Sequence, residues 1–156
     1  LCEEIGTNPD REPDCGPCRI HPTAGAIAIG ARPFLVAYNI NLGTGDLSTS
    51  KTIARAIRHS SGGLRYVKAM GFEIKDRGIV QVSINMVNFR GTPLFRVFEM
   101  VKSEADRYGV PVIGSEVVGL VPADALFDCA EFYLKLEAFK RDQILENRLT
   151  ETEGAE

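Results

Sequence analysis

The sequence has 156 residues, of which 44% are hydrophobic and 25% charged, and its net charge is −3 at pH 7. This composition is typical of a soluble globular domain, and the absence of a Lys and Arg excess argues against nucleic acid as the main partner. No apolar run approaches the about 18 residues of a membrane span, and no secretory leader is recognisable. We therefore expect a cytoplasmic protein without a membrane partner. Because the sequence begins with Leu1 instead of Met, we expect it to be a segment of a longer protein.

We expect a single domain over 1–156, with a linker over 1–13 and a frayed acidic tail over 150–156. The cysteines are expected to be reduced thiols, because a chain of this size without a secretory signal fits a reducing compartment. They are Cys2, Cys15, Cys18 and Cys129.

The first predicted strand spans 34–41 and follows a Gly/Pro-rich loop. Alternate side chains of a strand point to opposite faces, so this strand has one apolar face and one face that ends in two amides. The two sets are Phe34, Val36, Tyr38 and Ile40 on one face, and Leu35, Ala37, Asn39 and Asn41 on the other. After a loop at 43–46, a helix with Ser48 or Thr49 as its N-cap is expected to end before Gly62.

A β-hairpin follows, with strands over 66–74 and 79–87 joined by a tight turn at 76–78. The second of these strands alternates between apolar Val80, Val82, Ile84 and Met86 and polar Gln81, Ser83 and Asn85. Thr92 is the expected N-cap of a second helix, with Pro93 in its first turn. The apolar face of that helix is predicted to consist of Leu94, Phe98, Val101, Ala105 and Tyr108.

A fourth strand is predicted over 110–118 and a third helix from Ala123 onward, and the segment 137–149 has a helical pattern. The residues of the third helix that are expected to face the core are Leu126, Phe127, Ala130, Tyr133 and Leu134.

The predicted order is β-α-β-β-α-β with helices added at the C-terminal end, which is the split β-α-β or ferredoxin-like arrangement of an α+β protein. Its helices would cover one face of an antiparallel sheet and leave the other face open. The residues expected on the open face are Asn39, Asn41, Gln81, Ser83, Asn85 and Glu116, with Ser115 beside them. A solvated face is the alternative. However, neutral amides and a hydroxyl beside the small Ala37 and Ala69 favour a face that is covered by a ligand or a partner.

The segment 15–18 reads CGPC, which is the dithiol motif of thioredoxin-type redox sites. No strand is predicted before it and no long helix after it, so its context does not match such a site. A zinc site formed by Cys15, Cys18 and His21 would lack a second pair of cysteines, so no metal is expected. The preferred interpretation is a Gly-Pro loop that carries two thiols. His59 is expected to be a solvated histidine at a helix end, and no Ser/His/Asp or Cys/His catalytic set can be placed.

Four blocks carry a resemblance to a known family. In chain order they read GPCRIHPTAGA, GARPFLVAYNINL, VQVSINMVNFRGTPLFRVFEMV and GVPVIGSEVVGLVPADAL. Together they resemble glutamate formimidoyltransferase (formiminotransferase), and in particular its C-terminal subdomain, over about residues 14–149 of this chain.

This resemblance implies the transfer of a formimino group from N-formimino-L-glutamate to tetrahydrofolate, a step of histidine degradation and one-carbon metabolism. Tetrahydrofolate is then a co-substrate, and no metal is implied. The folate lies between two α/β subdomains in this family, so the expected partners are an N-terminal subdomain and the two substrates, and a homodimer is left open. The catalytic histidine lies on the N-terminal subdomain, for which no block matches here. The chain therefore resembles a substrate-binding half without a catalytic residue, inactive or nearly so alone.

The resemblance also assigns a folate-binding loop to Gly16, Pro17, Cys18, Arg19, Ile20, His21, Pro22, Thr23, Ala24 and Gly25. Cys15 stands where the family commonly has Phe, so the CGPC motif is an accident of this sequence, and the family does not require a histidine at His21. The alternative function is a stand-alone ferredoxin-like module for ligand binding or assembly, without transferase activity.

Overall fold

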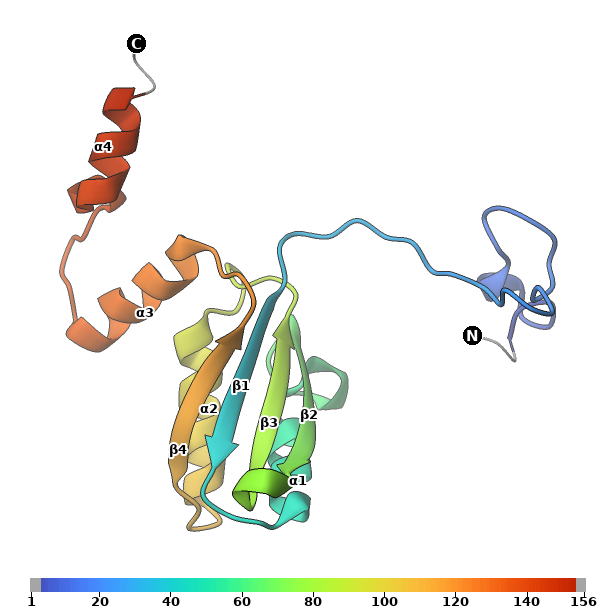
Figure 1. Cartoon of the computed structure of the whole chain (residues 1–156), viewed down its shortest axis with the longest axis horizontal. Coiled ribbons are helices and arrows are strands. Elements are labelled where there is room, and N and C mark those ends of the chain that lie inside the picture. Colours follow the sequence, from blue (N-terminus) through green and yellow to red (C-terminus); the bar gives the residue numbers. More distant parts are fainter. Residues whose placement is uncertain (1–3, 154–156) are drawn as a thin grey trace. The chain divides into compact units, whose positions relative to one another are not determined.

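The computed structural model describes residues 4–153 and divides the chain into two compact units, Leu1–Ala31 and Arg32–Glu156. The second unit contains a four-stranded sheet in the spatial order β2-β3-β1-β4, in which all neighbours are antiparallel (Figure 1). Its strands are β1 (Val36–Leu42), β2 (Val67–Ile74), β3 (Ile79–Met86) and β4 (Val112–Val118). The chain order and this strand order together confirm the predicted α+β, ferredoxin-like arrangement.

Two helices, α1 (Leu47–Ile57) and α2 (Leu94–Asp106), lie behind the sheet in Figure 1, and among the described residues of this unit no α-helix covers its front. Two more, α3 (Ala123–Leu134) and α4 (Leu145–Glu153), follow β4. Short 3-10 turns join the elements: η2 (His59–Ser61), η3 (Lys75–Arg77) and η4 (Arg141–Gln143), with η1 (Pro9–Arg11) in the first unit. The expected linker 1–13 thus includes η1, and α4 continues into the expected tail as far as Glu153.

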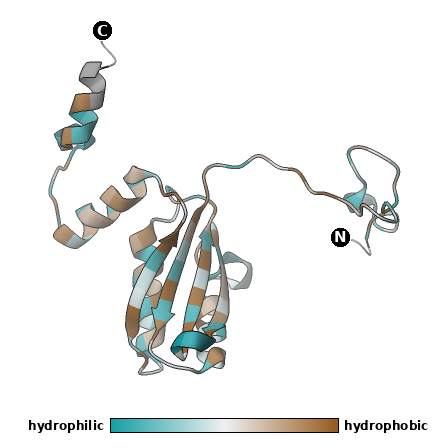
Figure 2. Ribbon diagram, viewed as in Figure 1, coloured by the Kyte–Doolittle hydropathy of each residue, from teal (hydrophilic) through white to brown (hydrophobic). Residues whose placement is uncertain are grey.

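The core lies between the sheet and α1 and α2. It is built from every second residue of β1 and β3, and the strands in Figure 2 accordingly alternate between apolar and polar bands. The strand residues with at most 1% of their surface exposed are Val36, Ile40, Leu42, Val67, Val80, Val82, Ile84 and Met86. The alternation predicted for β3 is therefore confirmed. Phe34, by contrast, precedes β1 and is 50% exposed, so its predicted place on the apolar face is wrong.

Helix α1 packs very closely against β2. A Cβ atom added at Gly71 would lie 2.5 Å from the backbone nitrogen of Lys51 and 2.6 Å from the Ser50 hydroxyl oxygen. Because real Cβ atoms do not approach backbone atoms so closely, only glycine fits at this position of the sheet. The strand begins at Val67, since Tyr66 has a left-handed backbone with φ of 67° that a strand does not accommodate.

Both predicted helix caps differ from the structure. Asp46, two residues before Ser48, caps α1: its carboxylate accepts hydrogen bonds from the Ser48 backbone N–H (2.9 Å) and the Thr49 hydroxyl (2.7 Å). The bonds from Thr49 and Ser48 lower the pKa of Asp46 from 3.8 to about 2, since they favour its charged form. Thr92 does not cap α2 either, because its hydroxyl donates to the Arg65 carbonyl oxygen.

The predicted core face of α3 is also wrong. Leu126, Tyr133 and Leu134 are 45%, 48% and 68% exposed, Ala130 is exposed, and the residue of α3 that is buried is Ala125. The reason is that α3 packs on α2, where Phe132 stacks on Phe95 with ring centroids 4.2 Å apart, instead of packing on the sheet. Of the other predicted core residues, Phe127 is half-buried, and Tyr108, which follows the end of α2, is 46% exposed.

Arg141 of η4 connects the segment after α3 to that helix. Its guanidinium forms ion pairs with Asp128, Asp124 (3.6 Å) and Glu131 (3.7 Å), which follow one face of α3. The same guanidinium lies 5.3 Å from the ring centroid of Phe127 and stacks over Phe139 as well. One cation therefore joins three carboxylates and two aromatic rings.

Candidate functional site

Strand register brings the predicted polar residues of β1, β3 and β4 onto the open face of the sheet. Asn39 of β1 lies opposite Ser83 of β3 on one side and Glu116 of β4 on the other. One row further along the sheet, Asn41 lies opposite Gln81, and at the other end Asn85 lies opposite Ala37. All six predicted residues thus share the face that α1 and α2 do not cover.

Four of these side chains form one hydrogen-bonded network across three strands. The Gln81 amide nitrogen donates to the Asn41 amide oxygen (2.9 Å) and to Glu116 Oε1 (3.0 Å), and Asn39 Nδ2 donates to the same Glu116 oxygen (3.1 Å). Both N–H groups of Gln81 are therefore used, which fixes the orientation of its amide. Its carbonyl oxygen, and the second oxygen of Glu116, have no hydrogen-bond partner among residues 4–153. We call these four residues the polar network.

The polar network is only partly accessible to solvent. Asn41 and Gln81 are 7% and 8% exposed, because they occupy the two middle strands, whereas Asn39 is half-buried and Glu116 is exposed. Within the described residues, every fully buried side-chain oxygen or nitrogen has a hydrogen-bond partner. The unpartnered Gln81 carbonyl oxygen must therefore keep some contact with the surface, and it remains available as an acceptor.

The structure adds two apolar residues to this face. Met70 lies opposite Ser83 and Phe72 lies opposite Gln81, both on β2. They are 61% and 45% exposed, although large apolar side chains normally avoid solvent. The sequence could have predicted that Met70 and Phe72 share one face, since they are two residues apart in a predicted strand. A polar network beside an exposed aromatic side chain suits a flat ligand that carries hydrogen-bonding groups at its edge.

Two neighbours that were expected on this face lie elsewhere. Ala69 is 4% exposed and belongs to the core, because it alternates with Met70. Ser115 lies opposite Ile40 and therefore points to the helix side of the sheet, the side of Tyr38. The expected projection of Ser115 toward the open face is thus wrong, whereas the expected orientation of Glu116 is confirmed.

The loop 16–25 lies in the first unit. Its residues are exposed apart from the half-buried Ile20. His21 organises the turn: its Nδ1 accepts hydrogen bonds from the backbone N–H groups of Ala24 (3.0 Å) and Thr23 (3.3 Å), and its carbonyl oxygen accepts one from Gly25 (3.0 Å). A ring nitrogen that accepts two N–H groups carries no proton, so the proton of the neutral ring lies on Nε2.

The thiols of the loop form no cluster with other ligands. Cys15 and Cys18 are exposed and free, and Cys129 on α3 is free and half-buried, whereas Cys2 lies outside the described residues. No group of three or more His, Cys, Asp or Glu residues in the described part of the chain is arranged to hold a metal ion. Likewise, no helix within residues 4–153 is long and apolar enough to span a bilayer.

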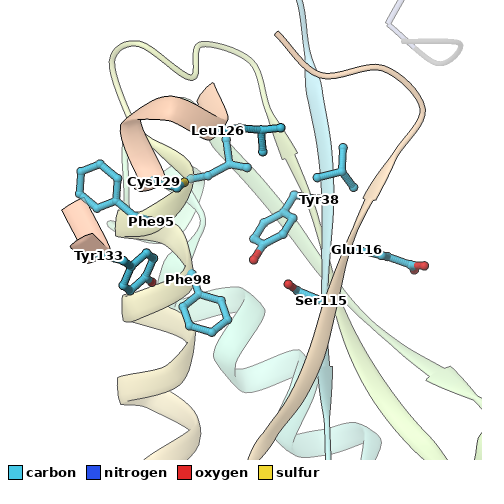
Figure 3. A pocket seen from close by; sticks show the side chains of 10 residues that line it. Tyr38, Phe95, Phe98, Ser115, Glu116, Leu126, Cys129 and Tyr133 are labelled. Carbon is cyan, nitrogen blue, oxygen red and sulfur yellow. The ribbon is translucent and has the colours of Figure 1, made fainter. Parts of the chain in front are cut away.

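A second concave site lies on the helix side of β4. It is an open groove of about 360 Å³ between β4, α2 and α3, and Figure 3 shows Tyr38 and Ser115 pointing into it while Glu116 points away. Its lining residues are Tyr38, Leu94, Phe95, Phe98, Ser115, Glu116, Val117, Leu126, Cys129 and Tyr133. Burial raises the pKa of the Tyr38 hydroxyl, and burial with a hydrogen bond to Glu99 raises that of Tyr133. Both phenols therefore stay protonated at neutral pH.

The fold and the open face define a ferredoxin-like α+β domain with a hydrogen-bonded polar surface on its sheet. Residues 37–150 match the family model described as the formiminotransferase domain, and the chain therefore belongs to the formiminotransferase family. This confirms the family that the sequence blocks resemble. The matched range contains the whole polar network but not the loop 16–25.

Relatives of known identity agree with this assignment. The chain is 56% identical over 141 residues to the glutamate formimidoyltransferase of Streptococcus pyogenes serotype M1 and 48% identical over 145 residues to that of Thermoplasma acidophilum. These alignments cover 90% and 93% of this chain but 47% and 48% of the two relatives. The formimidoyltransferase-cyclodeaminase of Gallus gallus is 43% identical over 83% of this chain and 25% of its own length. The chain thus spans about half the length of the glutamate formimidoyltransferases that it matches.

Proposed function

We propose that this chain is the folate-binding half, the C-terminal subdomain, of a glutamate formimidoyltransferase. The whole enzyme would transfer a formimino group from N-formimino-L-glutamate to tetrahydrofolate in histidine degradation. The observation that carries the proposal is the Gln81 amide, which donates to Asn41 and Glu116 on the open face of a formiminotransferase domain. Such a network holds acceptor atoms in fixed positions before any ligand arrives.

The chemistry of a reduced pterin fits the polar network. The pterin ring is flat, and its pyrimidine edge presents adjacent N–H donors, which need acceptors in the same plane. The second oxygen of Glu116 and the carbonyl oxygen of Gln81 are acceptors on this face. Phe72 and Met70 supply an apolar surface next to them. We therefore assign the pterin to the network and place its ring toward β2, with Ser83 and Asn85 at the rim.

The loop 16–25 would bind folate as well, as its resemblance to the folate-binding loop of the family implies. The N–H groups of Arg19, Thr23, Ala24 and Gly25 already donate within the loop, so those of Gly16 and Cys18, which are exposed, are left for an anionic ligand. The glutamate carboxylates of the folate tail are ligands of that kind. Arg19 would add a positive charge to the loop.

The transfer reaction requires more than these groups provide. The attacking nitrogen of tetrahydrofolate forms a bond to the formimino carbon, and a base must take its proton. The glutamate nitrogen then leaves as that carbon–nitrogen bond breaks, and it must receive a proton. Amides and hydroxyls bind and orient, but they are too weakly basic to take a proton at neutral pH. We therefore expect the general base, a histidine, on an N-terminal subdomain, and the rate of this chain alone to be close to zero.

The first experiment measures binding by calorimetric titration of the 156-residue chain with 5-formyltetrahydrofolate, a stable reduced folate. Weak binding is expected, and Glu116→Gln should weaken it further because the carboxylate is lost. Glu73→Gln is the matched control, since Glu73 is an exposed glutamate of the same sheet that is paired with Val80 and faces the helix side. Equal effects of both substitutions would contradict the assignment of the polar network.

The second experiment measures transfer. The chain is mixed with tetrahydrofolate and N-formimino-L-glutamate, and the 5-formimino product is followed with and without the N-terminal half of the Streptococcus pyogenes relative. Product is expected only when that half is present. Full turnover by this chain alone would contradict the division of the enzyme into a binding half and a proton-transfer half.

The alternative function is a stand-alone ferredoxin-like module for ligand binding or assembly, without transferase activity. The two hypotheses differ in the encoding gene. A coding segment for the missing half immediately before Leu1 supports the transferase, and its absence supports the module.

A further inference from the structure

The free edge of β2 lies in a region of the chain that carries only positive charge. β2 is an edge strand of the sheet (Figure 1). Residues 47–72, which form α1, η2 and most of β2, contain five Lys and Arg residues and no Asp or Glu, although the whole chain has 21 acidic and 18 basic residues. The five are Lys51, Arg55, Arg58, Arg65 and Lys68. Within the described residues, none of the five forms an ion pair, so the fold leaves these cations without counter-charges.

Two adjoining grooves bring four of these cations to the edge of β2. The first, of about 210 Å³, lies between Lys51, Arg55 and Arg58 on the helix side and Met70 and Gly71 of β2. The second, of about 330 Å³, lies between η2 and residues 67–70 of β2, which include Lys68. Arg58 and Met70 line both grooves, so the two are continuous along the strand. Neither groove is lined by a carboxylate.

The backbone of β2 offers unused hydrogen-bonding groups along these grooves. On its inner side the strand pairs with β3, and just before it the Val87 N–H donates to the Tyr66 carbonyl oxygen (2.9 Å). Bonded and non-bonded pairs alternate in an antiparallel ladder, so the N–H and C=O groups of Ala69 and Gly71 point to the free edge. No residue in the described part of the chain forms a hydrogen bond with these groups. Such an edge can accept a further strand.

The register of β2 also determines where the side chains of an added strand would point, because residues opposite each other share one face of a sheet. A residue opposite Ala69 or Gly71 would point to the helix side, toward the cations of the first groove. At these two positions β2 itself presents only a methyl group and a hydrogen atom, so an added side chain meets no larger one. A residue opposite Met70 would point to the open face, where Met70 is 61% exposed.

We propose that the free edge of β2 binds an extended segment of a partner protein as a fifth strand, antiparallel to β2, with acidic and apolar residues in alternation. The acidic residues stand opposite Ala69 and Gly71, and the apolar residues stand opposite Met70 and Phe72. A basic strand would be repelled, and an apolar strand would cover the cations without pairing them, which is costly. The charge of the edge therefore selects the partner. The proposal does not rest on the proposed function, since this edge lies outside the polar network.

The first test titrates the 156-residue chain with the blocked peptide Val-Glu-Val-Glu-Val-Gly-Trp and follows its fluorescence. The chain has no Trp, so the signal of the Trp comes from the peptide alone. Saturable binding that weakens with added salt is expected, because exposed ion pairs are screened. The control peptide Val-Lys-Val-Lys-Val-Gly-Trp has the same pattern with the opposite charge and should not bind. Absence of binding by the acidic peptide, or equal binding of both peptides, would overturn the proposal.

The second test asks whether the backbone of the acidic peptide pairs with β2. In the proposed register, the N–H groups of its glutamates face Ala69 and Gly71, and the N–H group of its central valine points away. A methyl group on the nitrogen of the second glutamate should therefore lower the affinity by about tenfold, because it removes a hydrogen bond. A methyl group on the nitrogen of the central valine should leave the affinity unchanged. Equal affinities of the two methylated peptides would indicate a general anion site and overturn the strand pairing.

The third test uses matched variants of the chain. Lys51→Gln combined with Arg55→Gln removes two charges of the first groove, and the affinity for the acidic peptide should fall by about tenfold. Arg96→Gln combined with Lys102→Gln makes the same change in net charge on α2, away from both grooves, and should leave the affinity nearly unchanged. All four side chains are exposed, so the fold should persist, which circular dichroism checks. Equal losses in the two double variants would show that only the net charge acts, against the proposed site.

Discussion

The two faces of the sheet are built from the same strands but have different roles. Toward the helices, β1 and β3 present side chains that are almost completely buried, such as Ile40 and Ile84. Toward the open side, the residues between them are Asn39, Asn41, Gln81 and Ser83, and two of these, Asn39 and Gln81, donate to Glu116 of β4. One face therefore supplies the free energy of folding through apolar burial, and the other holds polar atoms in place.

Because side chains alternate along a strand, neighbouring residues separate these roles. A substitution at one residue should change stability, whereas a substitution at the next should change ligand binding. Four predictions test this difference between the two faces, and they follow in order of decreasing expected effect.

The largest effect is expected for Ile40→Ala. Ile40 is fully buried in the core, so its truncation removes apolar contacts and leaves a cavity, with a loss of about 2–5 kcal/mol in the free energy of unfolding. Asn39→Ala, on the adjacent residue, removes one partly exposed hydrogen bond to Glu116 and should cost less than about 1 kcal/mol. Urea denaturation measures both. Similar losses for the two variants would show that the faces do not differ in this way.

The next effect tests how tightly the covered face is packed. Gly71→Ala forces a Cβ atom into the backbone of α1 near Lys51, so β2 and the helix must move apart, at a cost of about 1–3 kcal/mol. Gly114→Ala makes the same change at a strand position with open space and should leave stability unchanged. Thermal unfolding followed by circular dichroism compares the two variants. An unchanged melting temperature for Gly71→Ala would contradict the close approach.

The third prediction concerns the centre of the open face. Gln81→Leu removes both N–H donors that Gln81 supplies to the polar network and leaves the Asn41 oxygen buried without its partner, so stability should fall by about 1–3 kcal/mol. The same variant should abolish binding of 5-formyltetrahydrofolate, since the acceptors are no longer held in place. Ser83→Ala, at the next open-face residue along β3, should change stability by less than about 0.5 kcal/mol. Retained folate binding in Gln81→Leu would exclude the network as the pterin site.

The smallest effect is a dependence of stability on pH at the start of α1, on the covered side. The hydrogen bonds from Thr49 and Ser48 lower the pKa of Asp46 from 3.8 to about 2. A group with a lowered pKa in the folded state adds stability above its unfolded value, and this contribution is lost as the pH falls from 3.8 toward 2. Asp46→Asn retains a cap without a charge. The difference in melting temperature between the wild-type chain and Asp46→Asn should therefore shrink over this pH range, and a constant difference would contradict the cap.

The sheet was predictable because its pattern is local. The alternation in β1 and β3 identifies the two faces, and the chain order of the elements identifies the ferredoxin-like arrangement. The positions of Asn39 and Gln81 on one face follow from these facts. The hydrogen bond from Gln81 to Glu116 does not, since it joins residues 35 positions apart and depends on the register of three strands.

Two of the wrong predictions, the N-cap of α1 and the core face of α3, have physical causes as well. Asp46, Ser48 and Thr49 are all good capping residues within one turn, and their identities alone do not decide which of them comes first in the helix. The apolar residues of α3 have helical spacing, but spacing does not determine what covers them: here the helix packs on α2 through Phe132, and Leu126 remains exposed. The loop 16–25 lies in a separate unit, so its role still rests on the resemblance of its sequence.

Arg141 makes the attachment of the C-terminal segment different in kind from that of the sheet. The core does not respond to ionic strength, whereas the pairs of Arg141 with Asp124, Asp128 and Glu131 are partly exposed and are screened by salt. Added salt should therefore release the segment after α3 while the sheet stays folded. Cleavage by trypsin after Lys135 or Lys140 should then become faster as salt is added. The attachment of the C-terminal segment would in this way depend on ionic strength.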